Sequence, residues 1–151
     1  KPGNIMLIND MVSLFVPSPL IGENTNEIGE RFPDMTYVFD EEIQEKVRKV
    51  AKEKGVDVKE GIYCQLKGPH FETKMDIKVL RQLGVTSVAM SLGIEAIAAH
   101  HMGMKVCGLS MIVNYAAGML DEKISHEDIM QMTKKASKDV LILLENLIKE
   151  I

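Results

Sequence analysis

Cysteine is scarce in this sequence, and long apolar runs are missing from it. Its two cysteines, Cys64 and Cys107, stand in apolar runs and far from any Cys-x-x-Cys spacing, which argues against a disulfide framework and against a zinc ribbon. We therefore expect two reduced, buried thiols in a cytoplasmic protein. No apolar run approaches the roughly 18 residues that a membrane span needs, and no charged-then-apolar leader opens the chain, so we expect no membrane partner.

Excess positive charge is missing too. The formal net charge is -4 and the isoelectric point is near 5.6, and no basic stripe is available to neutralise the phosphates of a nucleic acid. Lysine and arginine do gather in residues 46–54. They alternate there with Val47, Val50 and Ala51 at helical spacing, which indicates the solvated face of a helix. Nucleic acid is therefore excluded as a partner.

Several signatures of metal and nucleotide chemistry are also missing. His100 and His101 are adjacent, so on a helix they point about 100° apart, and no His-Glu-x-x-His spacing occurs. Gly-x-Ser-x-Gly, Gly-x-x-x-x-Gly-Lys and Gly-x-Gly-x-x-Gly do not occur either, which argues against the commonest hydrolases, nucleotide triphosphatases and dinucleotide enzymes. We expect no metal and no bound cofactor.

What the sequence does contain is a regular alternation of strand and helix patterns. The predicted strands are 4–10, 61–67, 86–91 and 105–113, and the predicted helices are 40–55, 73–84, 93–103 and 125–151. The strand runs are almost continuously apolar, as in strands covered on both faces. The alternation predicts an α/β fold, with a mostly parallel or mixed sheet and helices on both faces. With 46% apolar residues, we expect residues 1–151 to form one domain.

Polar residues stand at the end of each predicted strand or directly after it. They are Asp10, the turn 68–72, Ser91 and Asn114. In an open α/β sheet, ligands bind at the carboxyl ends of the strands, so these positions predict one binding site. A stretch of about twenty polar and Pro- or Gly-rich residues, 16–36, is longer than structureless connections usually are, and such loops are usually functional or mobile.

Each of these residues also has a purely structural interpretation. Glu72 stands just ahead of a helix, where the dipole stabilises a carboxylate by about 0.3–1 kcal/mol. Phe71 is of a type that more often packs than binds ligands, Ser91 is a plausible helix cap, and Asn114 suits a turn. From the residues alone, the interpretation stops at an α/β domain with a predicted binding site made of polar residues at the strand ends.

Five stretches in order resemble the trimeric purine nucleoside phosphorylases, specifically their C-terminal half and the bacterial branch. They are PGNIMLIND, SPLIGENTNEIGERFPDMT, EGIYCQLKGPHFET, GVTSVAMSLGIEAIAAHHMGMKVCGLSMIVN, and AAGM followed by SHEDI. The resemblance covers essentially the whole chain. It implies phosphorolysis of 6-oxopurine nucleosides such as inosine and guanosine to base and ribose 1-phosphate, with phosphate as co-substrate. It also implies a homotrimer and a larger phosphorylase domain of which this chain is the C-terminal half.

The resemblance also implies a role for each matching residue. Glu72 would bind the ring NH and exocyclic edge of the purine, and Asn114 would bind the five-membered ring nitrogen and the 6-oxo group. These two are the expected catalytic residues. The expected substrate-binding residues are Phe71 stacking on the base, Tyr63 and Met90 along the ribose, Ser91 at a phosphate oxygen, and His126 at the ribose 5'-hydroxyl.

The sequence also departs from the family pattern. His70 replaces a small hydroxyl residue, Val113 replaces a threonine, and Ile28 replaces an aromatic residue that reaches across a subunit boundary. The glycine-rich loop bearing serine and the Arg-x-His segment, which hold most of the phosphate in the family, do not occur in the chain. We therefore expect the 151 residues alone to be nearly inactive, and their unpaired strand edges to promote self-association.

Two other interpretations remain open from the sequence. The chain could be a non-catalytic domain that keeps the fold and uses it for purine binding or a structural role. Less plausibly, it could be an unrelated α/β enzyme whose motif overlap is coincidental.

Overall fold

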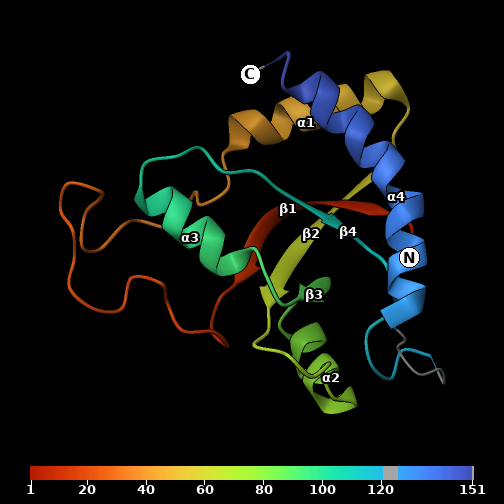
Figure 1. The fold of residues 1–151 in the computed structure, drawn as a ribbon, viewed down its shortest axis with the longest axis horizontal. Helices are drawn as coiled ribbons and strands as arrows, with labels where there is room; N and C mark the ends of the chain where they lie inside the picture. The colour runs from red at the N-terminus through yellow and green to blue at the C-terminus, as the bar shows by residue number, and fades with distance from the viewer. Residues whose placement is uncertain (121–125, 151) are drawn as a thin grey trace.

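The computed structural model describes residues 1–120 and 126–150 and has an α/β architecture (Figure 1). The elements in chain order are β1 (Ile5–Val12), α1 (Glu41–Lys54), β2 (Val58–Gln65), α2 (Lys74–Gln82), β3 (Ser87–Ala89), α3 (Gly93–His101), β4 (Gly108–Met111) and α4 (His126–Leu147). The side chains of residues 126–129, 131, 135 and 136 also lie outside the description. Each predicted strand and helix is present, with somewhat different bounds.

The sheet is mixed, with the strand order β3-β2-β1-β4. β2 runs parallel to β1 and to β3, whereas β4 pairs antiparallel with β1. Ile5 is therefore opposite Val58 at the start of β2 but opposite Met111 at the end of β4. The carboxyl end of β4 consequently lies at the opposite end of the sheet from the carboxyl ends of the other strands.

Helices cover both faces of the sheet. Side chains along β1 alternate between the two faces, so each face has apolar residues on which helices pack. Ile5 and Leu7 face α1 and α4, in clusters that include Val50, Leu143, Val47 and Leu147. Met6 and Ile8 face the other side, where they pack with Tyr63, with Ala96 of α3 and with Val38 and Phe39 of the long loop. The core therefore lies in two layers, one on each side of the sheet.

The third helix on the first face is α2, which packs over one of the two cysteines. Ile77 and Leu80 of α2 contact the buried Cys64. Both Cys64 and Cys107 are free thiols, and desolvation by burial raises the pKa of each to about 11. At neutral pH both thiols are therefore protonated and are poor nucleophiles.

No helix in residues 1–120 and 126–150 is long and apolar enough to cross a membrane.

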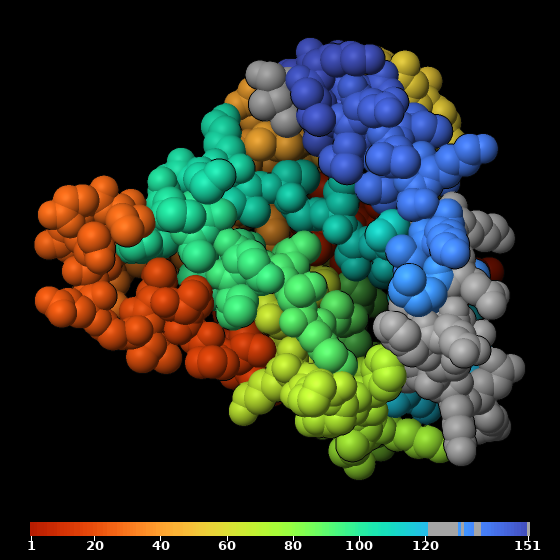
Figure 2. Space-filling model, viewed as in Figure 1, coloured from red at the N-terminus to blue at the C-terminus, as the bar shows by residue number. Residues whose placement is uncertain are grey.

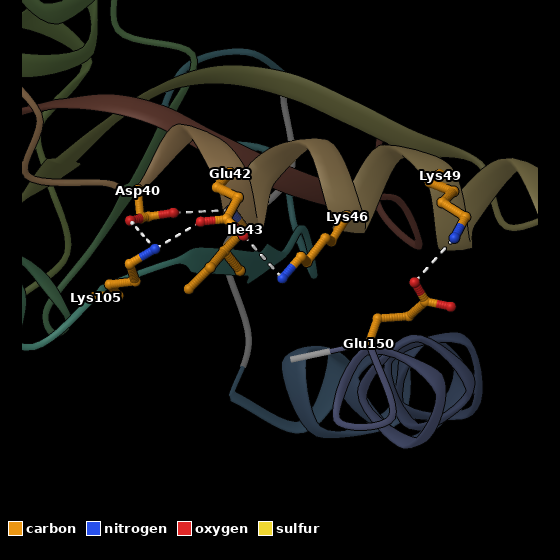
Figure 3. A network of polar contacts seen from close by, with 7 residues as sticks. All are labelled: Asp40, Glu42, Ile43, Lys46, Lys49, Lys105 and Glu150. Carbon is orange, nitrogen blue, oxygen red and sulfur yellow. Dashed lines mark hydrogen bonds and ion pairs between the residues drawn. The ribbon is translucent and has the colours of Figure 1, made fainter.

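Polar contacts tie α1 to the segments on either side of it (Figure 3). Lys105, just ahead of β4, lies 2.7 Å from Glu42 Oε2 and 3.4 Å from Asp40 Oδ2. The hydrogen bond from Lys105 is the main reason that the pKa of Glu42 falls to about 2. At the other end of the helix, Lys49 pairs with Glu150 after α4 at 2.9 Å. These contacts are exposed and position α1 more than they stabilise it.

We expect Asp40→Ala to lower the free energy of unfolding by about 1 kcal/mol, because Asp40 is the N-cap of α1. Its side chain accepts a hydrogen bond from Ile43 N at 2.9 Å. Asp40→Asn keeps an oxygen at this position and should lose only a few tenths of a kcal/mol. Urea unfolding of both variants measures the difference. Equal losses in both variants would show that the negative charge of Asp40 stabilises the protein and that its hydrogen bond to Ile43 N does not.

The long connection between β1 and α1 contains no helix or strand over residues 13–40. It is fastened to the end of α3, since His100 Nε2 lies 2.8 Å from Asp34 O. Within the loop, Asn24 Nδ2 donates a hydrogen bond to Gly29 O at 3.0 Å. The prediction that this stretch is irregular is confirmed, and contacts to α3 hold it against the domain.

Candidate functional site

A cavity of about 320 Å³ is bounded by the two edge strands of the sheet. Its lining residues come from the turn after β2, from β3, and from β4 with the turn that follows it. They are Leu66, Phe71, Glu72, Thr86, Ser87, Val88, Ala89, Met90, Ser110, Met111, Ile112, Val113, Asn114 and Ala116. Its size lies at the lower end of the range for small-molecule sites. We call it the edge cavity.

Four of the predicted site residues line the edge cavity together: Phe71, Glu72, Met90 and Asn114. Phe71 is 42% exposed and Met90 is 38% exposed, whereas Glu72 and Asn114 are half-buried. An aromatic face, a thioether, a carboxylate and an amide therefore border one space. This set offers an apolar platform with two polar groups beside it, the usual composition of a site for a flat polar ligand.

One carboxylate oxygen of Glu72 is held by the backbone. Glu72 Oε1 accepts a hydrogen bond from Ala117 N at 3.0 Å, while Oε2 accepts none from the residues that the structure describes. The first bond orients the carboxylate, and the second oxygen stays available to a donor in the cavity. A single carboxylate can accept from several donors at once.

Asn114 has the same division between anchoring and free groups. One Nδ2 hydrogen donates to Tyr115 O at 3.1 Å. The second hydrogen and Oδ1 have no partner within residues 1–120 and 126–150. An amide has two donors and one acceptor oxygen, so Asn114 retains one donor and one acceptor for a ligand. Glu72 adds a second acceptor, which makes the polar edge of the cavity complementary to a ligand with both donors and acceptors.

The hydrogen bonds that cap the start of α2 come from the neighbours of Glu72. Thr73 is the N-cap of α2, and its hydroxyl accepts from Asp76 N at 3.1 Å. Asp76 Oδ2 in turn accepts from Thr73 N at 2.8 Å, which completes a capping box. Because Thr73 and Asp76 satisfy the start of the helix, the carboxylate of Glu72 is left to bind Ala117 and to face the cavity.

The turn that carries Phe71 and Glu72 requires glycine at its start. Gly68 has φ 63°, in the left-handed region that favours glycine. A Cβ atom there would lie 2.5 Å from Met90 Sδ, so a larger residue would displace the thioether. Gly68 thus lets the turn approach the end of β3 closely, which brings Met90 and Glu72 to the same cavity.

Two further predicted residues, Tyr63 and Ser91, are not among those that line the edge cavity. Tyr63 is 2% exposed, and its hydroxyl donates a hydrogen bond to the Ser91 carbonyl oxygen. Burial raises the pKa of the Tyr63 phenol. The side chain of Ser91 is exposed. Their proposed contacts with ribose and phosphate stay predictions.

The interpretation of Ser91 as a helix cap is wrong. The N-cap of α3 is Leu92, which has no side-chain cap bond. Instead, Gln65 at the end of β2 reaches across, and its Oε1 accepts from Ile94 N at 2.9 Å. The carboxamide of a neighbouring strand therefore satisfies the start of this helix in place of a local hydroxyl. His126 begins α4, but its side chain lies outside the described residues.

The prediction that all four polar strand ends meet at one site is wrong in part. Asp10 lines a different cavity, of about 520 Å³, together with the long loop. Ser91 lines neither cavity. The rule for strand ends assumes parallel strands, whereas β4 is antiparallel. Asn114 reaches Glu72 because both edge strands border the same space, and not because the two strands end together.

Sequence reasoning missed three contributors to this region. The Ala117 N–H that holds Glu72 had no signal, because nearly every residue carries a backbone N–H. Gln65 had one, since it is a polar residue inside the apolar run GIYCQL. Ser87 lines the edge cavity, and its Oγ is buried without a hydrogen-bond partner. No group of three or more His, Cys, Asp or Glu side chains suited to a metal ion occurs in the part of the chain that the structure describes.

Comparison with known proteins gives consistent matches along the chain. Residues 1–149 match the family model of the phosphorylase superfamily. The chain is 36% identical over 150 residues to purine nucleoside phosphorylase 1 of Bacillus subtilis, covering 99% of this chain and 55% of that protein. It is 36% identical over 143 residues to the purine nucleoside phosphorylase of Bos taurus, covering 90% of this chain and 50% of that protein. The chain therefore spans about half the length of these curated relatives.

Solved structures give the same result for the fold. The structure of Schistosoma mansoni purine nucleoside phosphorylase in complex with inosine superimposes with a TM-score of 0.92 and 26% identity, covering 100% of this chain and 56% of that one. A schistosome purine nucleoside phosphorylase in complex with hypoxanthine gives a TM-score of 0.89 and 27% identity, again over 100% of this chain and 56% of that one.

Proposed function

Because the chain belongs to the phosphorylase superfamily, we propose that the protein containing it is a purine nucleoside phosphorylase. Its reaction is the phosphorolysis of 6-oxopurine nucleosides such as inosine and guanosine to base and ribose 1-phosphate, with phosphate as co-substrate. The observation that carries the proposal is that Glu72 and Asn114, the two expected catalytic residues, line one cavity with Phe71 beside them. The names of the relatives and the inosine complex of a similar structure support it.

The chemistry requires groups that bind the base better as it leaves. Cleavage of the bond between ribose and purine passes through a transition state with oxocarbenium character in the sugar and growing negative charge on the base. Interactions that strengthen with this charge lower the barrier. The free Nδ2 hydrogen of Asn114 meets this need, since donation to the five-membered ring nitrogen or the 6-oxo group strengthens as the base becomes anionic.

Glu72 supplies recognition of the six-membered ring. A 6-oxopurine carries a hydrogen on its ring nitrogen N1, and Oε2 of Glu72 is free to accept it. Hydrogen bonds that involve a charged group contribute about 1.5–3 kcal/mol. A 6-aminopurine has no hydrogen at N1, so its lone pair would face the carboxylate and leave both groups unpaired. The site therefore favours 6-oxopurines by attraction and disfavours 6-aminopurines by repulsion.

The remaining substrate contacts belong to the same proposal. Phe71 stacks on the base, Tyr63 and Met90 lie along the ribose, Ser91 binds a phosphate oxygen, and His126 binds the ribose 5'-hydroxyl. The glycine-rich serine loop and the Arg-x-His segment do not occur in this sequence, so most phosphate contacts come from elsewhere in the complete gene product. We accordingly place residues 1–151 as the C-terminal half of a larger phosphorylase domain.

Assembly and compartment follow from the family as proposals too. We propose a homotrimer, as the resemblance implies, located in the cytoplasm. The two free cysteines support a reducing compartment, where unpaired cysteines are the rule.

The complete gene product is expected to cleave inosine in the presence of phosphate and to prefer it to methylthioadenosine by roughly 100-fold or more in kcat/KM, because a hydrogen-bonding site strongly rejects a mismatched partner. Release of hypoxanthine from inosine and of adenine from methylthioadenosine, followed by chromatography, measures both rates. A preference for methylthioadenosine would reject the 6-oxopurine assignment. Hypoxanthine binding without any turnover would instead favour a non-catalytic purine-binding domain.

A further inference from the structure

A third cavity, of about 510 Å³, lies between α2 and the turn after β4, and its charged lining residues are all basic. The lining residues are Lys74, Ile77, Lys78, Arg81, Gln82, Ala117, Gly118 and Met119. We call it the basic pocket. The helix α2, which supplies most of these residues, lies at the molecular surface (Figure 2). The basic pocket shares no lining residue with the edge cavity.

The three cations of the basic pocket are placed against the electrostatic preferences of the helix. Lys74 is the first residue of α2, where the positive end of the helix dipole disfavours a cation. Lys78 follows at i+4 and Arg81 at i+7, so all three lie on one face and repel one another. All three residues are exposed, so they form a patch of positive charge on a chain of net charge -4, and a negative charge beside them would relieve the repulsion.

No described carboxylate supplies that charge. Within residues 1–120 and 126–150, Lys74, Lys78 and Arg81 take part in no ion pair. The helix on the neighbouring part of the same sheet face is different, since Arg48 of α1 pairs with Glu45 and with Glu60. Lys52 and Lys54 of α1 are also in no ion pair among the described residues, so what distinguishes α2 is that three such cations line one pocket.

The backbone opposite these cations adds a hydrogen-bond donor. Gly118 has φ 75°, and a Cβ atom there would lie 2.7 Å from Lys74 Cγ, so bare backbone packs on the lysine stem. The N–H of Ala117 donates to Glu72, and the N–H of Met119 donates to Ala116 O. The Gly118 N–H donates to no residue that the structure describes. This single N–H is one further donor for an anion bound beside the cations.

We propose that the basic pocket binds a small metabolite that carries two or more phosphate groups. Three cations carry more positive charge than the roughly -1.5 to -2 of one phosphate group offsets, and lysine and arginine are the usual phosphate ligands. The volume of about 510 Å³ is within the range of small-molecule sites. The acidic net charge of the chain disfavours a nucleic acid as the source of the phosphates. The proposal is independent of the purine assignment, because the two cavities have different linings.

The test is calorimetric titration of the complete protein with sodium tripolyphosphate in about 0.15 M salt, where unspecific surface attraction is screened. We expect saturable binding at one site per chain. The double substitution Lys78→Gln with Arg81→Gln should raise the Kd at least about tenfold, because it removes two charge-assisted contacts. Lys52→Gln, at the exposed end of α1, is the matched control and should leave the Kd unchanged.

Three further arms separate this site from its alternatives. Saturating hypoxanthine should not displace tripolyphosphate, which distinguishes the basic pocket from the edge cavity. If ATP binds much more tightly than tripolyphosphate, the ligand class is a nucleotide. If the two bind equally, the pocket recognises only the polyphosphate group. Thermal unfolding should show the double variant to be as stable as the parent, since the substitutions remove like-charge repulsion.

The proposal is overturned by any of three results. The first is failure of the parent protein to bind tripolyphosphate, and the second is binding by the double variant with the parent Kd. Binding that appears only after Asp121→Asn and Glu122→Gln would also overturn it, because these acids, which follow in the sequence, would then be the partners of the cations.

Discussion

Glu72→Gln lowers kcat/KM for inosine by roughly 10- to 150-fold in the complete gene product, if Glu72 binds the purine as proposed. The range corresponds to the loss of one charge-assisted hydrogen bond, about 1.5–3 kcal/mol. Glutamine retains an oxygen that accepts from Ala117 N, the bond that orients the native side chain. It removes the negative charge that the N1 hydrogen of the base would meet. The loss is therefore one of recognition and leaves the turn intact.

Glu72→Ala separates the two tasks of the carboxylate. Alanine removes both the contact with the base and the anchor for Ala117, so we expect a larger loss than with glutamine and a small decrease in stability. Glu145→Gln, at an exposed position of α4, is the control for the chemical change and should retain full activity. Parent-like activity in both Glu72 variants would remove this residue from the mechanism. Asn114→Ala is expected to lower turnover by more than about tenfold on the same grounds.

Leu7→Ala is expected to lower the free energy of unfolding by about 2–5 kcal/mol, the range for a buried leucine replaced by alanine. Leu7 is 0% exposed and packs between β1 and the two helices α1 and α4, against Ile43, Val47 and Leu147. Truncation leaves a cavity between layers that the sheet prevents from closing. A loss of this size is a large part of the stability of an ordinary domain.

Urea denaturation of the parent and variant proteins measures the effect of Leu7→Ala. Leu141→Ala is the matched control, because Leu141 lies on α4 with 56% of its surface exposed and should change the stability by less than about 0.5 kcal/mol. Similar losses at both positions would show that leucine content, and not burial between the sheet and its helices, determines the result. Far-UV circular dichroism confirms that both variants keep their helices.

The fold was predictable because its local signals agree with its packing. The apolar stripe over Ile43, Val47 and Val50 faces the sheet in α1, and the alternation of strands with helices led to the correct architecture. Asp40 and Thr73, the first residues of the predicted helices 40–55 and 73–84, are the N-caps of α1 and α2. Periodicity and capping depend only on nearby residues, so the sequence contains them in full.

The site was predictable only in part, because it depends on how distant strands meet. Phe71, Glu72, Met90 and Asn114 were singled out by motif and do line one cavity. The capping role for Ser91 failed because a side chain from another strand, Gln65, occupies the start of α3. No local pattern encodes a hydrogen bond between residues that are far apart in the chain.

The sequence by itself determined the elements of this protein, the faces that they bury and the family to which it belongs. Only the tertiary structure decided that β4 runs antiparallel and that both edge strands border one cavity. It also decided that the Ala117 N–H orients Glu72 and that three unpaired cations of α2 face a pocket of their own. The physical reason is range. Hydrophobic periodicity and helix caps act over a few residues, whereas strand direction and the partners of a carboxylate are settled by contacts that form when the whole sheet assembles.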